Sequence, residues 1–266
     1  MNTFPKIMGI LNITSDSFSD GGLFIEKDLA IDRALQMIDE GADIIDIGGE
    51  STRPGSLPVD EKEELDRTIP VITAIRAINQ NIRISIDTTR PKVALSAVKA
   101  GANYINDVSG LRKSLELASI AAEHKAGLII MHSIKTPENM QIDPVYKNVL
   151  SEVFSFLKTQ ITKANEIGVK EIYADVGIGF GKSIDHNLEL LNNLDFFYKL
   201  NVPLVLGISR KAFIGKLTSI ESPKDRDIAT VLIHSLLLKN KLSIIRVHNV
   251  KMAATLKKLY QSLSIS

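Results

Sequence analysis

Eight short apolar stretches, evenly spaced and each followed by polar residues, constrain the fold of this chain more than any other feature. The seven intervals between Asn12 and His248 average about 34 residues, the size of one strand–helix unit. This repeat predicts an α/β fold, a (β/α)8 TIM barrel, in which an active site would lie at the carboxyl ends of the strands. The expected strands are Lys6–Leu11, Asp43–Ile47, Ile82–Ile86, Tyr104–Ile105, Gly127–Met131, Glu171–Ala174, Pro203–Leu206 and Ser243–Val247.

Helical patterns occupy the segments between these strands. Asp60 and Glu63 have the spacing of a capping box and predict a helix that extends to about Ile78. Pro70 is expected to kink this helix or to begin its second half. Further helices are expected on the apolar stripe Ala30–Ile38, after Pro91, within Asp143–Gly168 as the longest helix, and from about Val250 to Leu263.

Length and composition favour a single barrel domain that spans residues 1–266. The 32 basic and 31 acidic side chains nearly cancel, which gives no reason to expect a nucleic-acid or membrane partner. The absence of cysteine excludes disulfides, thiolate catalysis and cysteine-ligated metals. No signal-peptide pattern or long apolar run is evident, so a cytoplasmic protein is expected.

Acidic and amide side chains stand at several strand ends. Asp175 precedes the glycine-rich run Gly177–Lys182, and its carboxylate could accept two adjacent N–H groups of a ligand; a phosphate-binding loop or a tight turn is the alternative. Asp87 could bind a ligand or cap the helix that follows. Asn106 and Asp107 could belong to the same cluster or form only a turn.

Cationic side chains follow the last two strands. Ser209, Arg210 and Lys211 could line the barrel mouth or form an exposed basic turn. Arg246 and His248 lie two residues apart, so both side chains fall on one face of the strand. If that face points inward, these residues predict an anion site.

The evidence for a metal or a carboxylate pair is weaker. Asn12 could coordinate Mg²⁺ together with a substrate phosphate, or could only stabilise its own turn. The histidines offer no zinc-type pair. Asp46 and Glu50 could form a catalytic pair of carboxylates, but the sequence does not define their separation.

Two connections are longer than packing requires. The segments 14–24 and 51–59 are rich in serine, glycine or proline. They could be lids over an active site or ordinary exposed loops.

Taken together, the motifs resemble those of the dihydropteroate synthase family. The stretches Met8–Gly22 and Asp46–Gly55 are similar to its first two signatures. The remaining motifs follow in the family's order over nearly the whole chain: Asp87, Asn106–Gly110, Asp175 with its glycine turn, Ser209–Lys211 and Arg246–His248.

The resemblance implies a transferase that joins 6-hydroxymethyl-7,8-dihydropterin pyrophosphate to para-aminobenzoate in folate biosynthesis and releases pyrophosphate. It implies Mg²⁺ as cofactor, with Asn12 as ligand, and a homodimer formed through the late helices. Asp87, Lys211, Arg246, His248 and Arg53 would act in the reaction. The substrate-binding residues would be Thr52, Arg53, Asp87, Asn106, Asp175, Phe180, Ser209, Lys211, Arg246 and His248.

The chain also departs from the family pattern. Ser15 and Val176 stand where the family usually has proline, and Asn249 stands where an aspartate usually follows the histidine. Ile134–Lys135 replaces a Gln-Gly type pair. Three alternatives therefore stay open: a pterin-binding barrel without turnover, an enzyme like the corrinoid-linked methyltransferases, and a phosphosugar enzyme on the same fold.

Overall fold

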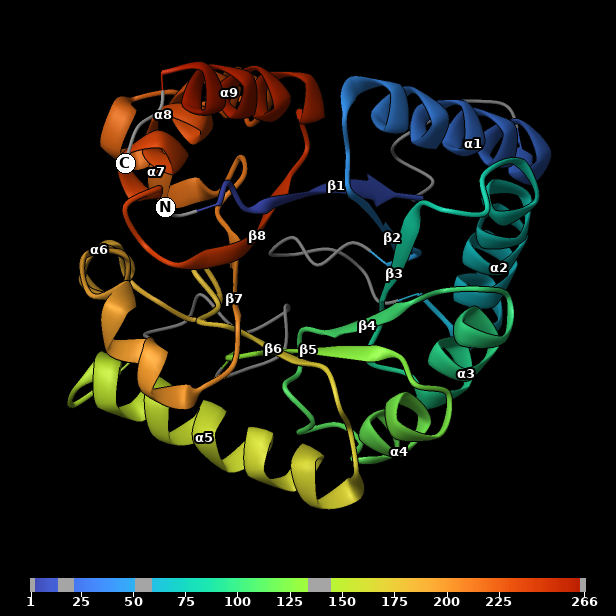
Figure 1. Ribbon diagram of the computed structural model, residues 1–266, viewed down its shortest axis with the longest axis horizontal. Coiled ribbons are helices and arrows are strands. Elements are labelled where there is room, and N and C mark those ends of the chain that lie inside the picture. The colour runs from blue at the N-terminus through green and yellow to red at the C-terminus, as the bar shows by residue number, and fades with distance from the viewer. Residues whose placement is uncertain (1–2, 14–21, 51–58, 134–144, 264–266) are drawn as a thin grey trace.

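The chain forms a closed barrel of eight parallel strands in sequence order, surrounded by helices (Figure 1). The computed structural model describes residues 3–13, 22–50, 59–133 and 145–263. Each strand pairs with its sequence neighbours, and β1 closes the barrel on β8. The strands are β1 Lys6–Asn12, β2 Ile44–Gly48, β3 Arg83–Asp87, β4 Tyr104–Asp107, β5 Gly127–Met131, β6 Ile172–Asp175, β7 Leu204–Gly207 and β8 Leu242–Val247.

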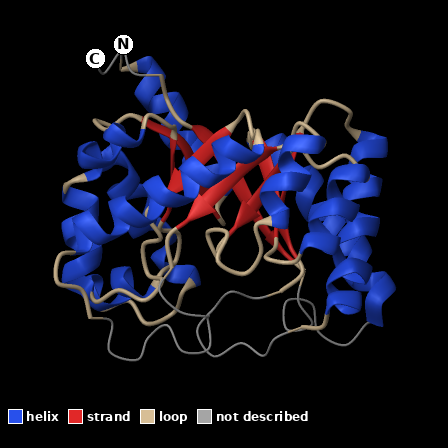
Figure 2. Cartoon of the chain, turned by 90° about the horizontal axis from the view of Figure 1, so that it is seen from below, coloured by secondary structure: helices blue, strands red, loops and turns tan. Residues whose placement is uncertain are grey.

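The helices cover the outer face of the barrel, and both termini lie near the end at which the strands begin (Figure 2). The predicted (β/α)8 architecture is therefore confirmed. The helices are α1 Gly22–Glu40, α2 Glu61–Ile78, α3 Pro91–Lys99, α4 Glu116–Glu123, α5 Val149–Ile167, α6 Ile184–Asn192, α7 Ala212–Thr218, α8 Asp227–Leu237 and α9 Val250–Ser262, with 3₁₀ turns η1 Leu194–Leu200 and η2 Lys224–Arg226.

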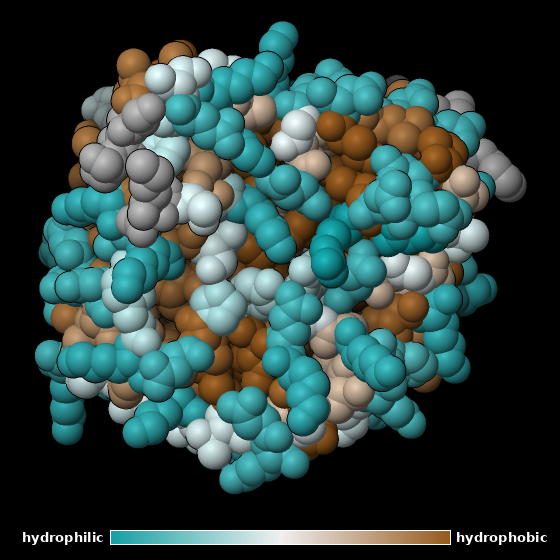
Figure 3. Space-filling view, viewed as in Figure 1, coloured by the Kyte–Doolittle hydropathy of each residue, from teal (hydrophilic) through white to brown (hydrophobic). Residues whose placement is uncertain are grey.

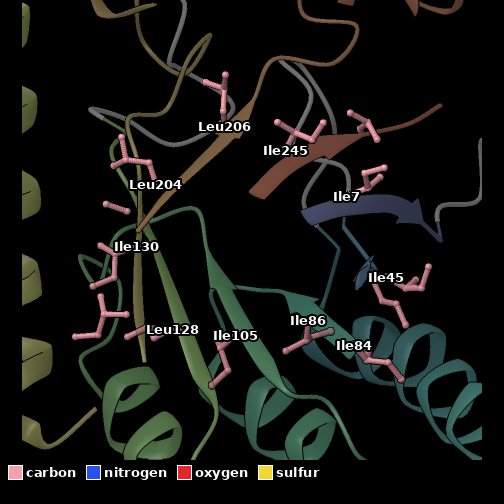
Figure 4. Close-up of a cluster of buried hydrophobic side chains, with 14 of the residues drawn as sticks. Ile7, Ile45, Ile84, Ile86, Ile105, Leu128, Ile130, Leu204, Leu206 and Ile245 are labelled. Atoms are coloured by element: carbon pink, nitrogen blue, oxygen red, sulfur yellow. The ribbon is translucent and has the colours of Figure 1, made fainter. Parts of the chain in front are cut away.

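Strand alternation divides the buried residues into two sets. One set of side chains points outward and packs against the helices, and includes Ile45, Ile86, Ile105 and Leu206 (Figure 4). The other set fills the barrel interior with one apolar layer, because successive residues of a strand face opposite sides of the sheet. This inner layer consists of Met8, Ile44, Tyr104, Ile129, Tyr173, Val205 and Ile244.

Several local predictions need correction. Asp60 caps α2 by accepting from the Glu63 N–H at 2.7 Å, but the Glu63 carboxylate pairs with Arg67 and does not complete the capping box. Helix α2 has residues on both sides of Pro70, and those that follow Pro70 remain buried, so the kink predicted there stays a prediction. Pro91 begins α3 as predicted.

Two further helices differ from the prediction in one respect each. Helix α5 lies within the predicted segment Asp143–Gly168, and the Asn148 side chain caps its start by accepting from the Ser151 N–H at 2.8 Å. It has 19 residues, the same number as α1, so it is not longer than every other helix. Helix α1 begins at Gly22, within the connection predicted over 14–24.

The face that carries the termini is covered mainly by hydrophilic side chains, with smaller hydrophobic areas between them (Figure 3). Among the helices of the described residues, none has both the length and the apolar character needed to cross a membrane.

Candidate active site

A polar layer lies directly above the apolar inner layer of the barrel. Moving two residues along a strand keeps the side chain on the same face. The step from Ile44 therefore leads to Asp46, and the step from Tyr173 leads to Asp175. The same step on β3, β4 and β8 brings Asp87, Asn106 and Arg246 to this level, where Asp87 pairs in register with Asn106.

Arg246 links two carboxylates across the barrel. Its Nε donates to Asp46 Oδ2 at 2.5 Å, and its Nη2 donates to Asp87 Oδ2 at 2.7 Å. Burial raises the pKa of Asp87 to about 7, although Arg246 opposes the shift. Burial alone would lower the pKa of Arg246, but Asp46 and Asp87 outweigh it and raise that pKa. The alternative that Asp87 caps the next helix is wrong, because Arg90 is the cap residue of α3 and no side chain caps it.

The two polar residues at the end of β4 have different roles. Asn106 is buried and its Nδ2 donates to Asp46 Oδ2 at 3.3 Å, so it belongs to the polar layer. Asp107 instead accepts from the N–H groups of Ser109 and Leu111 at 2.8 and 2.6 Å. Asn106 therefore joins the cluster of polar residues at the strand ends, and the turn interpretation applies to Asp107.

Asp175 presents a buried carboxylate beside open space. Its Oδ1 accepts from the Gly177 N–H at 2.7 Å, which leaves Oδ2 on the side of Gly207. A Cβ atom at Gly207 would lie 3.6 Å from Oδ2 and 3.9 Å from Arg246, so the missing side chain keeps this space free. Burial raises the pKa of Asp175, and nearby Lys211 is the largest opposing influence.

Lys211 points from the start of α7 toward the glycine turn. Its Nζ donates to the Ile178 carbonyl and lies 4.6 Å from the centre of the Phe180 ring. Burial lowers the pKa of Lys211 to about 8, while Asp175 opposes the shift. An ammonium between a carboxylate and an aromatic face is suited to bind an electron-rich ring.

The neighbouring Arg210 has a structural role. It forms two hydrogen bonds to Asp227, from Nε at 2.6 Å and from Nη2 at 2.8 Å. The exposed-turn interpretation of the basic triplet therefore fails for both cations, since Arg210 is paired and Lys211 is half-buried and bonds the Ile178 carbonyl.

A cavity of about 870 Å³ opens on this cluster. Ser209 and His248 lie together on its wall: the Ser209 hydroxyl accepts from the His248 N–H at 3.1 Å and contacts His248 Nδ1 at 3.0 Å. The predicted site residues on its lining are Asn12, Phe180, Ser209, Lys211, Arg246 and His248. Thr52 and Arg53 lie outside the described residues.

The surroundings of Asn12 suit a metal that is bound mainly by a ligand. Among the described residues, no group of three or more acidic or histidine side chains could hold an ion by itself. Mg²⁺ usually takes only one or two protein oxygens and completes its shell with water and phosphate. The Asn12 side chain on the cavity wall can supply one such oxygen.

Asp46 and Glu50 do not form a catalytic pair. Asp46 bonds Arg246, while Glu50 pairs with Arg90 at 2.6 Å. Each carboxylate therefore serves a different cation, which leaves the pair interpretation without support.

Asn249 has a local explanation. Its Oδ1 accepts from the Met252 N–H at 3.1 Å, which caps α9, and its Nδ2 donates to Asp227 Oδ2 at 3.0 Å. An aspartate here could cap the helix but would face the Asp227 carboxylate with no proton to donate. The departures at Ser15 and Ile134–Lys135 lie outside the described residues, and Val176 is buried in the core.

Two residues of the site were not predicted. Asp46 is fully buried and supports both Arg246 and Asn106, and Lys182 is buried behind the glycine turn. A carboxylate in the middle of an apolar strand was the signal for Asp46, because an unpaired charge is rarely buried. The Lys182 contacts depend on the turn's conformation, which the sequence pattern did not define.

Fold and site together define a class: a (β/α)8 barrel enzyme whose mouth holds acidic side chains in close contact with cationic ones. A family model described as pterin binding enzyme matches residues 8–248, and the chain belongs to that family. It is similar to the dihydropteroate synthase of Synechocystis, at 44% identity over 259 residues, which are 97% of this chain and 89% of that protein. The Bacillus subtilis enzyme of the same name is 43% identical over 97% of this chain and 88% of its own length.

Solved structures agree with this assignment. The dihydropteroate synthase of Clostridium difficile, crystallised in the presence of pteroic acid, has a TM-score of 0.91 at 41% identity, covering 100% of this chain and 98% of that one. The Xanthomonas albilineans enzyme with 4-aminobenzoic acid has a TM-score of 0.91 at 39% identity, covering 98% of this chain and 94% of that one.

Proposed function

We propose that this chain catalyses the dihydropteroate synthase reaction, in which the dihydropterin-methyl group passes from its pyrophosphate to para-aminobenzoate. The observation that carries the proposal is a cavity lined by Lys211, Arg246 and His248, with two buried polar side chains directly behind it: Asp175 lies close to Lys211 and Arg246, and Asn106 shares Asp46 with Arg246. The relatives named above support it, since they bear the name of this enzyme at more than 40% identity over nearly the whole chain.

The polar layer and Lys211 would bind the pterin. Asp175 Oδ2 would accept from the pyrimidine edge, and Asn106 and Asp87 would complete the hydrogen bonding. Lys211 would contact the pterin oxygen and ring nitrogen, and Arg246 would stack over the ring. These donors and acceptors are held on strands and by buried partners, which favours a preorganised site.

The cationic side chains would stabilise the pyrophosphate leaving group. When the bond from the methylene carbon to the pyrophosphate oxygen breaks, positive charge develops on the pterin and negative charge on the pyrophosphate. Arg246, His248 and Arg53 would bind the departing anion, and Asp87 would stabilise the cation. Mg²⁺, bound through Asn12 and the phosphates, would supply additional charge neutralisation.

The second substrate would attack from the outer part of the cavity. Phe180 and Ser209 line this cavity, and Thr52 and Arg53 would complete the para-aminobenzoate site. The neutral aniline nitrogen forms the new C–N bond and then loses a proton to solvent. The proposed pathway therefore needs no covalent enzyme intermediate and no general base. Positional isotope exchange within the pyrophosphate before amine addition, if measured, would support the stepwise route, and its absence would favour a concerted displacement.

A pyrophosphate-release assay with and without para-aminobenzoate tests the proposal. Release that depends on the amine and yields dihydropteroate is expected, and chelation of Mg²⁺ should reduce it. Pterin binding without turnover would instead indicate a binding barrel. Methyl transfer from a methylated pterin to a corrinoid would indicate the methyltransferase alternative.

Helix α8 supports the further proposal of a homodimer. Ile228, Leu232 and Leu236 recur every four residues on its outer face and are all more than half exposed. Such a stripe is typical of a helix that packs against another surface. Replacing Leu232 by aspartate is expected to yield monomers in sedimentation analysis; an unchanged oligomer would place the interface elsewhere.

A further inference from the structure

The glycine turn after β6 encloses a buried amine. The Lys182 side chain is only 4% exposed, and its Nζ donates to the carbonyls of Gly177 and Phe180 at 2.8 and 3.0 Å. A third contact joins Nζ to His132 Nδ1 at 3.0 Å. An ammonium has three N–H donors, so these acceptors match its full capacity.

The backbone of the turn allows this arrangement only with glycine. Gly177, Gly179 and Gly181 all have positive φ, at 69°, 80° and 63°. A Cβ atom at Gly177 would lie 1.8 Å from the His132 carbonyl oxygen, which is impossible. The left-handed residues curl the chain so that two of its carbonyls converge on the amine.

A charge on Lys182 is opposed by burial and by two neighbouring cations, so it depends on the acceptors around it. Burial lowers the pKa of Lys182, with Lys211 and Arg112 adding to the shift, while Asp175 opposes it. Burial and Lys182 lower the pKa of His132 to about 2, so this imidazole stays neutral and its Nδ1 can accept. Three acceptors around one cation provide the hydrogen bonds that a buried charge requires.

The Gly177–Gly181 turn also contacts other side chains of the candidate site. The Gly177 N–H donates to Asp175 Oδ1, and the Ile178 carbonyl accepts from Lys211. The Phe180 ring lies under the Lys211 ammonium. Any change in the shape of the turn would therefore move the groups that bind both substrates.

We propose that Lys182 is a positioning residue for the transfer reaction. Its ammonium holds the Gly177–Gly181 turn in the shape that places Phe180 and Lys211 on the cavity lining and Asp175 directly behind it. The role in catalysis rests on the proposed function, whereas the effect on the turn does not depend on it.

Chemical rescue tests the role of the cation. Lys182→Ala is expected to weaken binding of the dihydropterin pyrophosphate at least about tenfold, since hydrogen bonds to a charged group are lost. Propylammonium, entering through the cavity that Lys182 lines, should restore several-fold of the affinity, and 1-propanol of similar size should not. Affinity within twofold of wild type, or equal rescue by the alcohol, would overturn the proposal.

The pH dependence of pterin binding separates positioning from general loss of structure. The groups that influence the Asp175 carboxylate are Lys211, Arg246, Lys182 and the Gly177 N–H. In Lys182→Met the acid limb of pterin binding should move to higher pH, because one cation that lowers the Asp175 pKa is gone. A uniform loss of affinity at all pH values would show a structural role only and would contradict the proposal.

Hydrogen exchange of the turn makes the outcome independent of catalysis. Amides in residues 175–183 should exchange faster in Lys182→Met than in wild type, and Lys170→Met, at an exposed position two residues before β6, should leave them unchanged. If exchange is faster in Lys182→Met but the wild-type protein has no transferase activity, the proposed function is wrong and the role of Lys182 in the turn still holds. Unchanged exchange would refute that role.

Discussion

The two layers inside the barrel differ by a single step of strand alternation but have opposite properties. The lower layer, from Met8 to Ile244, consists of apolar and aromatic side chains that are almost fully buried. The upper layer holds Asp46, Asp87, Asn106 and Asp175 at a similar depth, together with the half-buried Arg246. Burial of apolar surface stabilises the first layer, while burial of charge makes the second costly unless every group is paired.

The upper layer is the part of the barrel interior in which buried charges lower the stability of the fold and are available for function. Arg246 is surrounded by two carboxylates, which leaves the polar layer with an excess of acidic groups in the ligand-free protein. Asp46 Oδ1 is buried without a hydrogen-bond partner among the described residues. A ligand that donates hydrogen bonds would complete this layer, so we expect mutations there to affect binding more than folding.

Loss of the Asp175 carboxylate should produce the largest effect. In Asp175→Ala the pterin would lose two hydrogen bonds to a charged group, which corresponds to about 10²- to 10⁴-fold weaker binding. Calorimetry with the dihydropterin pyrophosphate measures this change. The unfolding temperature should stay equal or rise, because a buried carboxylate is removed. Micromolar affinity in the variant would contradict the assignment, and Asp195→Ala, at an exposed site, serves as the control.

A truncation in the lower layer should show the reverse pattern. Ile129 is 1% exposed, and Ile129→Ala should lower the free energy of unfolding by about 2–5 kcal/mol through lost burial and a cavity. Urea denaturation measures the loss, and pterin affinity should remain within a few-fold of wild type. The exposed Ile78 supplies the matched control, Ile78→Ala. Loss of pterin affinity without loss of stability would abolish the distinction between the layers.

Asp46→Asn tests whether Asp46 holds the Arg246 guanidinium in place. The amide keeps the size of the side chain and can still accept from the guanidinium, but it removes the negative charge of the ion pair, so kcat/KM should fall about 10- to 100-fold. Steady-state kinetics of pyrophosphate release give this value, and Asp39→Asn on the exposed face of α1 is the control. Unchanged kinetics would mean that Asp87 alone orients the guanidinium.

The smallest effect concerns pH. Burial raises the pKa of Asp87 to about 7, so the free enzyme should gain kcat/KM as pH rises through neutrality and the carboxylate ionises. Because the folded state keeps a proton that the unfolded state loses above about pH 4, the contribution of this group to stability falls as pH rises from about 4 to 7. Asp87→Asn should remove both dependences. A flat rate profile in wild type would exclude Asp87 from the reaction.

The strands and the polar residues at their ends could be predicted because both follow from alternation and spacing. A period of two and a repeat of about 34 residues leave few alternatives to a closed parallel barrel. The same reasoning placed Asp175, Asn106 and Arg246 near one another before any geometry was known. It could not separate Asn106 from Asp107, because only the local turn decides which side chain bonds the backbone.

By itself, the sequence determined the barrel, the polar ends of its strands and the family to which the chain belongs, because these depend on periodicity and on ordered motifs. Only the tertiary structure decided which cation meets which carboxylate: Arg246 with Asp46 and Asp87, Arg210 with Asp227, and Lys182 with the carbonyls of the glycine turn. Such pairings join residues up to 200 positions apart. They depend on strand register and turn conformation, which no local pattern of residues specifies.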